Sequence, residues 1–249
     1  MKRFLTVDWD YFIAASSLQR MSLFPDGVDE NIDNKIQQII WGYRYLTPEL
    51  SAIGILQSDF ASMQDILRKN FSHPVENSVE NSMWNMFFPV NISHKEMYDY
   101  VKQIISDKDE EFEVYNVDFH HDLYSYHTAE EPVNCGNWAT CLKSEYPNMK
   151  YFWVKREDSQ EDTYYPEYLD GVLDLTDLYD LGFDYLYLCR SDCWSPPHLD
   201  EYFNKLWKSV NCGKSLIIEE AAITARTIPE VTPPSEFYRC YFESSDFQG

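Results

Sequence analysis

The chain alternates between short apolar runs and longer segments with the apolar period of a helix. The strand-like runs are RFLTVD, AIGILQ, EVYNVDF, KYFWVK, FDYLYLCRSD, KSLIIEEA and, near the end, FYRCYFE. Helical patterns occupy DENIDNKIQQIIWGYRYL, NWATCLKSEY and HLDEYFNKLWKSV. Parallel strands need a long crossover, usually a helix, so this alternation predicts an α/β fold: a three-layer, mostly parallel sheet with helices on both faces.

Residue patterns at the ends of these segments predict where two further helices begin. Ser58 or Asp59 would cap a helix after AIGILQ, and Ser93 with Glu96 has the spacing of a capping box, which predicts a helix start there. Between these helices, residues 70–92 are rich in Asn, Ser, Phe and Pro and are predicted to form an irregular excursion.

The rest of the chain shows no internal repeat and no linker. The charge run DKDEEFE at 107–113 is predicted to be a solvated turn. A chain of 249 residues with 44% hydrophobic residues has enough apolar material for a sizeable core. We therefore expect one domain spanning residues 1–249.

The charge balance limits the class of partner. The chain has 42 acidic and 20 basic residues, for a net charge of −22. This charge repels phosphate backbones and anionic membrane surfaces, so we expect no nucleic-acid and no membrane partner, and a cationic partner is favoured. No run approaches the ~20 apolar residues of a membrane helix, and the start is too short for a signal peptide. The six cysteines form no C-x-x-C pair and are interpreted as reduced thiols of a cytoplasmic protein, whose oligomeric state the sequence leaves open.

Acidic residues follow four of the predicted strands. In open parallel sheets, sites form at the carboxyl ends of the strands, so these side chains are expected to meet in one crevice. The residues at these ends are Asp8 and Asp10; Asp118, His120 and Asp122; Asp192; and Glu219 and Glu220.

The densest of these groups is the stretch VDFHHD. An extended segment alternates faces, so Asp118, His120 and Asp122 would point the same way, and His121 would lie on the opposite face in a supporting or structural role. Two carboxylates and one imidazole suit Mn²⁺, Fe²⁺ or Zn²⁺ better than Ca²⁺, which prefers oxygen ligands alone. The pattern therefore predicts a transition-metal site.

Three motifs, in order and spacing over residues 114–197, resemble those of the arginase and ureohydrolase fold. VDFHHD resembles its D-x-H-x-D metal motif, and NCGNW (134–138) resembles the Gly-Asn loop that helps to hold substrate. SDCWSPP (191–197) resembles its later D-x-D-x-x-x-P metal loop. The GNW form is most similar to an arginase-like family that includes peptide arginases, which convert arginine residues of peptides to ornithine and release urea.

The resemblance implies an arginase/deacetylase-like fold, a manganese cofactor of one or two ions, and a set of site residues. The implied metal ligands are Asp118, His120, Asp122 and Asp192. Arg190 stands at the first Asp of the later motif and cannot bind a cation, so Asp8 or Asp10 is expected to complete the site. The implied substrate-binding residues are Asn134, Gly136, Asn137 and Trp138.

The expected reaction is hydrolysis of the guanidinium group of an arginine residue in a peptide. A divalent metal lowers the pKa of bound water and so provides hydroxide to attack the guanidinium carbon. Asp122 is the candidate that carries the proton to the leaving amine. Glu219 or Glu220 would pair with the guanidinium, and only one of these neighbours in a strand can face the crevice.

Other functions are consistent with parts of the sequence. FLTVDWDYF resembles the N-terminal strand of haloacid-dehalogenase-type phosphohydrolases, with Asp8 as nucleophile and Asp10 as acid. A non-catalytic acidic module that binds a basic partner, and a metal-dependent deacylase of the same fold, are further alternatives. A cysteine nucleophile with His127 as base ranks below the metal site. His73, His94 and His198 are predicted to be surface or capping residues.

Overall fold

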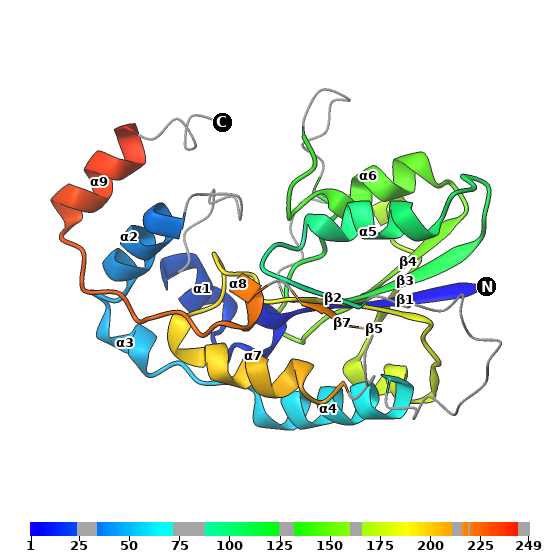
Figure 1. Ribbon diagram of the computed structural model, residues 1–249, viewed down its shortest axis with the longest axis horizontal. Helices are drawn as coiled ribbons and strands as arrows, with labels where there is room; N and C mark the ends of the chain where they lie inside the picture. The colour runs from blue at the N-terminus through cyan, green and yellow to red at the C-terminus, as the bar shows by residue number, and fades with distance from the viewer. Residues whose placement is uncertain are drawn as a thin grey trace.

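The computed structural model places one parallel sheet at the centre of the molecule (Figure 1). It describes residues 1–23, 34–71, 88–124, 132–159, 166–210, 216–218 and 220–243. Within these residues seven strands pair in the order β5-β4-β3-β1-β6-β2-β7. They are β1 (Lys2–Asp8), β2 (Phe88–Asn91), β3 (Phe112–Val117), β4 (Met149–Val154), β5 (Gly171–Leu173), β6 (Tyr185–Cys189) and β7 (Leu216–Ile218). Each pairing between these strands is parallel, which confirms the predicted sheet.

Helices cover both faces of the sheet, which makes three layers. Figure 1 shows α5 and α6 on one face and α4 and α7 on the other. The described α-helices are α1 (Ser17–Leu23), α2 (Asn34–Arg44), α3 (Pro48–Ser51), α4 (Gln57–Phe71), α5 (Glu96–Ile104), α6 (Trp138–Glu145), α7 (Asp200–Trp207), α8 (Glu220–Ile223) and α9 (Pro234–Glu243). A 3-10 turn, η1 (Trp9–Phe12), follows β1 directly.

Alternate residues of the central strands enter two different cores. Leu5 and Val7 of β1 pack with the α4 and α7 side, and Phe4 packs with the α5 and α6 side. β3 repeats the pattern, because Val117 joins the first core and Val114 the second. The period of two in strand side chains explains this division. The burial of both cores stabilises the sheet from both faces, at roughly 25 cal/mol per Å² of apolar surface removed from water.

Three of the predicted elements differ in the structure. AIGILQ contributes only a single antiparallel bridge, from Ile55 to Ile13, and α4 already begins at Gln57, before either proposed cap. FYRCYFE belongs to helix α9 and is not a strand. Its aromatic residues indicated a strand, but Phe237 stacks on Tyr43 of α2 with ring centroids 4.1 Å apart, so packing between helices decides its conformation.

The predicted irregular excursion at 70–92 is wrong at both of its described ends. Asn70 and Phe71 complete α4, and Phe88–Asn91 form β2, which lies between β6 and β7. Residues 72–87 lie outside the described part of the chain. The capping box was also misplaced, because α5 begins at Glu96 and Lys95 occupies its N-cap position.

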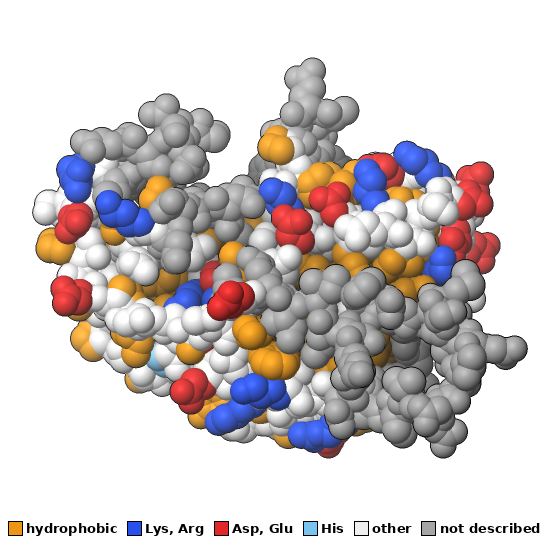
Figure 2. Space-filling model, in the orientation of Figure 1, with side chains coloured by type: hydrophobic (Ala, Val, Ile, Leu, Met, Phe, Trp, Pro, Cys, Tyr) orange, Lys and Arg blue, Asp and Glu red, His pale blue; other side chains and the backbone are white. Residues whose placement is uncertain are grey.

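Residues 107–111 of the charge run form the predicted turn between α5 and β3, but Phe112 and Glu113 already belong to β3 and are buried, so the prediction is wrong for these two. Asp107, Lys108 and Asp109 are exposed there, and Figure 2 shows acidic side chains gathered at this end of the molecule. Within the described residues, no disulfide bond joins Cys135, Cys141, Cys189 or Cys193. None of the described helices has the length and apolar character that crossing a bilayer requires.

Candidate metal centre

Polar side chains replace apolar ones at the carboxyl ends of β1 and β3, on the face that α5 and α6 cover. Thr6 pairs in register with Asn116, and each lies two residues before an aspartate, Asp8 or Asp118. Because alternate strand residues share a face, all four side chains continue the row that begins with Phe4 and Val114. The sheet therefore brings two carboxylates together below the start of α5.

His94, in the turn between β2 and α5, lies at the centre of these carboxylates. Its Nδ1 is 3.2 Å from Asp8 Oδ2, 3.2 Å from Asp118 Oδ2 and 3.1 Å from Asp122 Oδ2. Its Nε2 is 2.6 Å from the hydroxyl of Thr6, which holds the ring in this orientation. Asp8, His94 and Asp118 form one group of donors with the spacing of metal ligands.

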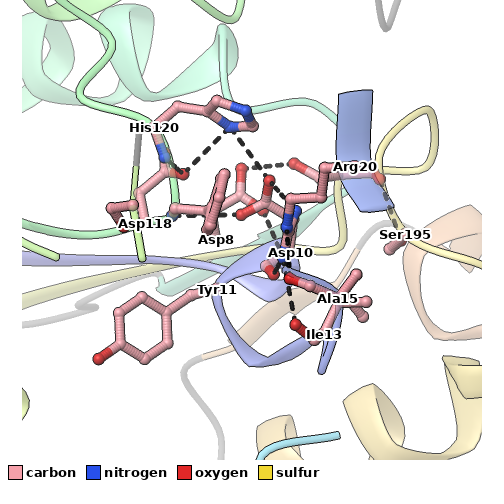
Figure 3. A network of polar contacts seen from close by, with 12 residues as sticks. Asp8, Asp10, Tyr11, Ile13, Ala15, Arg20, Asp118, His120 and Ser195 are labelled. Carbon is pink, nitrogen blue, oxygen red and sulfur yellow. Dashed lines mark hydrogen bonds and ion pairs between the residues drawn. The ribbon is translucent and has the colours of Figure 1, made fainter. Parts of the chain in front are cut away.

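A second group lies on the other side of Asp118. His120 Nδ1 is 3.1 Å from Asp10 Oδ2 and 3.7 Å from Asp118 Oδ1. Figure 3 shows the His120 ring above these two carboxylates. Asp10, Asp118 and His120 therefore form a second group that could hold an ion. Asp118 belongs to both groups, and one of its oxygens faces the first group while the other faces the second.

The spacing of these donors could accommodate a metal ion. Two donors that each lie about 2.1 Å from one ion at right angles are about 3.0 Å apart, close to the observed nitrogen–oxygen separations. Mixed imidazole and carboxylate donors suit Mn²⁺, Fe²⁺ or Zn²⁺. The side chain of His94 is 1% exposed and that of His120 is 23% exposed, so the second group is the more open to solvent.

Burial and mutual contact shift the pKa values across the cluster. Burial, with the neighbouring Asp10 and Asp118, raises the pKa of Asp8 to about 6. Burial would also raise the pKa of Asp118, but His120 and His94 hold it well below its ordinary value. Burial would lower the pKa of each histidine, yet the surrounding carboxylates raise both well above the ordinary value. Without a metal, protons on the imidazoles thus offset part of the negative charge.

Arg20 of α1 adds a fixed positive charge beside Asp10. Its guanidinium Nη1 is 3.3 Å from Asp10 Oδ2, and the side chain is buried with its Cζ 3.8 Å from the centroid of the Phe119 ring. Asp10 Oδ2 thus faces both Arg20 and His120 (Figure 3). An ion in the second group would compete with this guanidinium for Asp10 Oδ2. An ion in the first group would not, because Asp10 is not one of its donors.

Asp122 lies against the first group and is held by two donors. Its Oδ2 accepts a hydrogen bond from Trp138 Nε1 at 2.6 Å and lies 3.5 Å from the amide of Asn116. Burial, followed by the nearby Asp118, raises the pKa of Asp122 well above its ordinary value. Its φ of 53° is unusual for a residue other than glycine, and such conformations concentrate at functional sites.

The other residue of this stretch, His121, has a structural role in the fold. It is fully buried, its Nδ1 accepts a hydrogen bond from the backbone N–H of Leu123, and its carbonyl accepts one from Tyr151. The structure thus places His121 away from the two groups of donors.

Of the four predicted substrate-binding residues of the Gly-Asn loop, Trp138 is the one that contacts the centre. Asn134 Oδ1 accepts from the N–H of Gly136, and Asn137 Oδ1 accepts from the N–H of Asn134, so these amides bond within the loop. Trp138 is fully buried at the start of α6. Its contact is with Asp122, which the resemblance did not imply.

Asp192 lies away from both groups of donors, in an ion-pair network beyond β6. Its carboxylate receives two hydrogen bonds from Arg190, at 2.5 and 2.9 Å, and Arg226 Nη1 lies 3.7 Å from it. Arg226 also pairs with Asp200 at 2.7 Å. Arg190, Asp192 and Arg226 border a cavity of about 350 Å³ beside Trp41.

Of the two predicted guanidinium partners, Glu220 is the one within the described residues. Glu220 is exposed at the start of α8. Glu219 lies outside the described residues, as does His127.

His94 is the functional residue that sequence reasoning missed, and the prediction that it is a surface or capping residue is wrong. The signal was the run FPVN shortly before it, which forms β2 and brings the next turn to the carboxyl edge of the sheet. His198, in contrast, joins Tyr45 and the carbonyl of Ile53 and has a structural role.

The arrangement collects three carboxylates, two imidazoles and one guanidinium around a shared aspartate, Asp118. Comparisons with protein-family models, with curated protein sequences and with solved structures gave no match.

Proposed function

We propose that this protein is a metal-dependent hydrolase that converts arginine residues of a peptide to ornithine and urea. The observation that supports it most is the place of Asp118 between His94 and His120, with one oxygen toward each. This arrangement offers mixed donors that could hold a metal ion at the carboxyl edge of a parallel sheet, where α/β proteins bind their ligands. The choice of substrate rests on the three sequence motifs.

The residues of the centre would have different roles in this reaction. Asp8, His94 and Asp118 hold the ion of the first group, and Asp10 with His120 extends the site to a second. A divalent ion bound there supplies hydroxide near neutral pH for attack on the guanidinium carbon. Asp122, whose pKa is raised by burial, then holds the proton at its carboxylate and passes it to the leaving amine.

The charge of the molecule supports a cationic substrate. The net charge of −22 would attract an arginine-rich peptide and speed its encounter with the site. Free arginine needs groups that bind its α-amino and α-carboxylate, and the amide side chains of Asn134 and Asn137 already bond within their loop. A peptide makes no such demand, so we expect it to be the better substrate.

The proposal is tested by incubating the protein and Mn²⁺ with an arginine-rich peptide. Mass spectrometry should show a loss of ~42 Da per modified arginine together with release of urea, the products of hydroxide attack on guanidinium. Asp118→Asn should abolish both signals, whereas Asp59→Asn, on the surface of α4, should leave them unchanged. No urea from any arginyl peptide tested, with Mn²⁺ bound, would disprove the assignment.

Three further measurements separate this activity from its alternatives. High salt should weaken the apparent affinity for the peptide, because screening shortens the reach of the acidic surface. Faster turnover of free arginine than of peptide would move the assignment to an ordinary arginase. Release of phosphate from a phenyl phosphate, lost in Asp8→Asn, would favour the phosphohydrolase.

A further inference from the structure

Ser191, at the end of β6, carries an observation that the metal centre alone does not explain. Its φ is 51°, in the left-handed region, although it is not a glycine. The residue is fully buried, and its hydroxyl donates a hydrogen bond to Asp8 Oδ2 at 2.5 Å. Left-handed backbone is strained at a residue other than glycine, so the surrounding structure must stabilise it.

The oxygen that Ser191 contacts is the one that faces the metal donors. Asp8 Oδ2 lies 3.2 Å from His94 Nδ1, and Asp8 Oδ1 accepts a hydrogen bond from the N–H of Asp10 at 2.9 Å. Both oxygens of this carboxylate are therefore fixed, one by the backbone of η1 and the other by Ser191. Outer hydrogen bonds of this kind orient metal ligands and support their affinity.

The loop that presents Ser191 is joined to the segment that presents His94. The N–H of Arg190 donates to the carbonyl of Asn91, and the N–H of Asp192 donates to that of Ile92. Asn91 is the last residue of β2, and Ile92 follows it in the segment that leads to His94. The loop and the His94 turn thus form one unit, which sets the hydroxyl of Ser191 and the ring of His94 against the same oxygen.

Inside the loop, further contacts enforce the left-handed turn. Ser195 Oγ donates to the carbonyls of Arg190 and Ser191, and the N–H of Trp194 donates to the carbonyl of Ser191. Arg190 and Asp192, the residues on either side of Ser191, grip each other through two hydrogen bonds across it. The ion pair therefore holds the loop in the shape that directs the serine hydroxyl inward.

We propose that Ser191 is a positioning residue for the metal ligand Asp8. Asp192 supports this role indirectly, because its ion pair with Arg190 holds the loop that presents Ser191. The inference rests on the metal binding in the proposed function but not on the substrate. It also gives the SDCWSPP motif a different role from the one that the resemblance implies, since the serine hydroxyl, and not Asp192, reaches the centre.

The test compares the affinity for Mn²⁺ of two serine variants, measured by calorimetry and by the electron paramagnetic resonance spectrum of the bound ion. Ser191→Ala should weaken binding by about 10-fold or more, the usual effect of losing such a partner, and should alter the spectrum. Ser93→Ala is the matched control, since Ser93 is also buried beside a site residue but its hydroxyl has no hydrogen-bond partner among the described residues. Its affinity should stay within about 2-fold of the wild type.

Ser191→Gly separates the hydroxyl from the strained backbone. Glycine relieves the left-handed conformation but removes the donor, so we expect the metal-free variant to melt no lower than Ser191→Ala while Mn²⁺ binding stays weak. Wild-type affinity in both Ser191 variants would overturn the proposal, as would an equal loss in Ser93→Ala. A wild-type protein that does not bind Mn²⁺ would overturn it too, whereas binding without hydrolysis would refute only the proposed activity.

Discussion

At the scale of single residues, the clearest change of role concerns Trp138. The resemblance implied that it binds substrate, but it is fully buried and its indole N–H donates to Asp122 at 2.6 Å. Trp138→Phe keeps an aromatic ring and removes the donor. We expect a roughly 10-fold lower kcat, because the proton-carrying carboxylate loses a fixed partner, with little change in KM.

Steady-state kinetics on the peptide substrate, with the urea assay, measures this split. A Trp138 that gripped the substrate would instead raise KM in the variant and spare kcat. Tyr151→Phe, which removes a buried hydroxyl bonded to the carbonyl of His121, serves as a control for the loss of a neighbouring hydrogen bond.

The residues that the sequence could identify were those whose spacing is local. Asp118, His120 and Asp122 come from one short segment, so their nearness in sequence was enough to group them, but the predicted extended chain is wrong, because β3 ends at Val117 and Asp122 has a φ of 53°. His94 reaches the same point from another strand, and its partners, such as Thr6, lie 88 positions away in the chain. No local period records such a contact, which depends on the order of the strands in the sheet.

At the scale of elements, the C-terminal segment is fastened to the loop after β6. Arg226 pairs with Asp200 and donates to the carbonyls of Asp192 and Ser195. Further along, the N–H of Thr232 donates to the carbonyl of Gly42 in α2. The segment before α9 therefore ties three parts of the fold together.

Arg226→Leu should be strongly destabilising. In the variant, the buried Asp200 would keep Arg190, 3.4 Å away, as its remaining cationic partner in the described network. Breaking a buried ion pair costs about 3–5 kcal/mol of folding stability. Urea unfolding of the metal-free protein measures the loss, with Arg68→Leu, an exposed pair on α4, as the control. A loss of under about 0.5 kcal/mol would show that the network is not structural.

The same scale shows where elements were misjudged from sequence. β2 has only four residues and follows a long polar segment, so its apolar run was assigned to an excursion. α9 has strand-forming aromatic residues, yet it packs along α2. In both cases the neighbours in space, and not the local propensity, determine the element.

At the scale of the whole molecule, acidic charge is present in excess at the surface and at the centre. The net charge of −22 makes the folded state repel itself more strongly as pH rises, and salt screens this surface term. The buried cluster adds a contribution that salt screens much less. Metal binding would compensate the negative charge of this cluster, so the stability of the fold should depend on both the pH and the bound metal.

The pKa shifts determine whether the fold gains or loses stability as the pH rises. His94 and His120 have raised folded pKa values, so their stabilising effect is complete below about pH 6.5 and is lost as pH rises through those values. Asp8, raised to about 6, acts in the same direction, because its ionised form is disfavoured in the fold. The lowered pKa of Asp118 stabilises the fold above the ordinary value of 3.8 and is lost only in more acidic solution.

The metal-free protein should therefore melt at a lower temperature near pH 8.5 than near pH 6, in high salt as well as in low salt. Mn²⁺ must displace protons from the imidazoles, so its affinity, and the melting-temperature increase it produces, should be larger at the higher pH. Thermal melts with Mn²⁺ and with a chelator, at both pH values, measure the two effects. Asp118→Asn should remove the Mn²⁺-dependent increase. An increase of equal size at both pH values would show that the bound ion does not replace protons in this cluster.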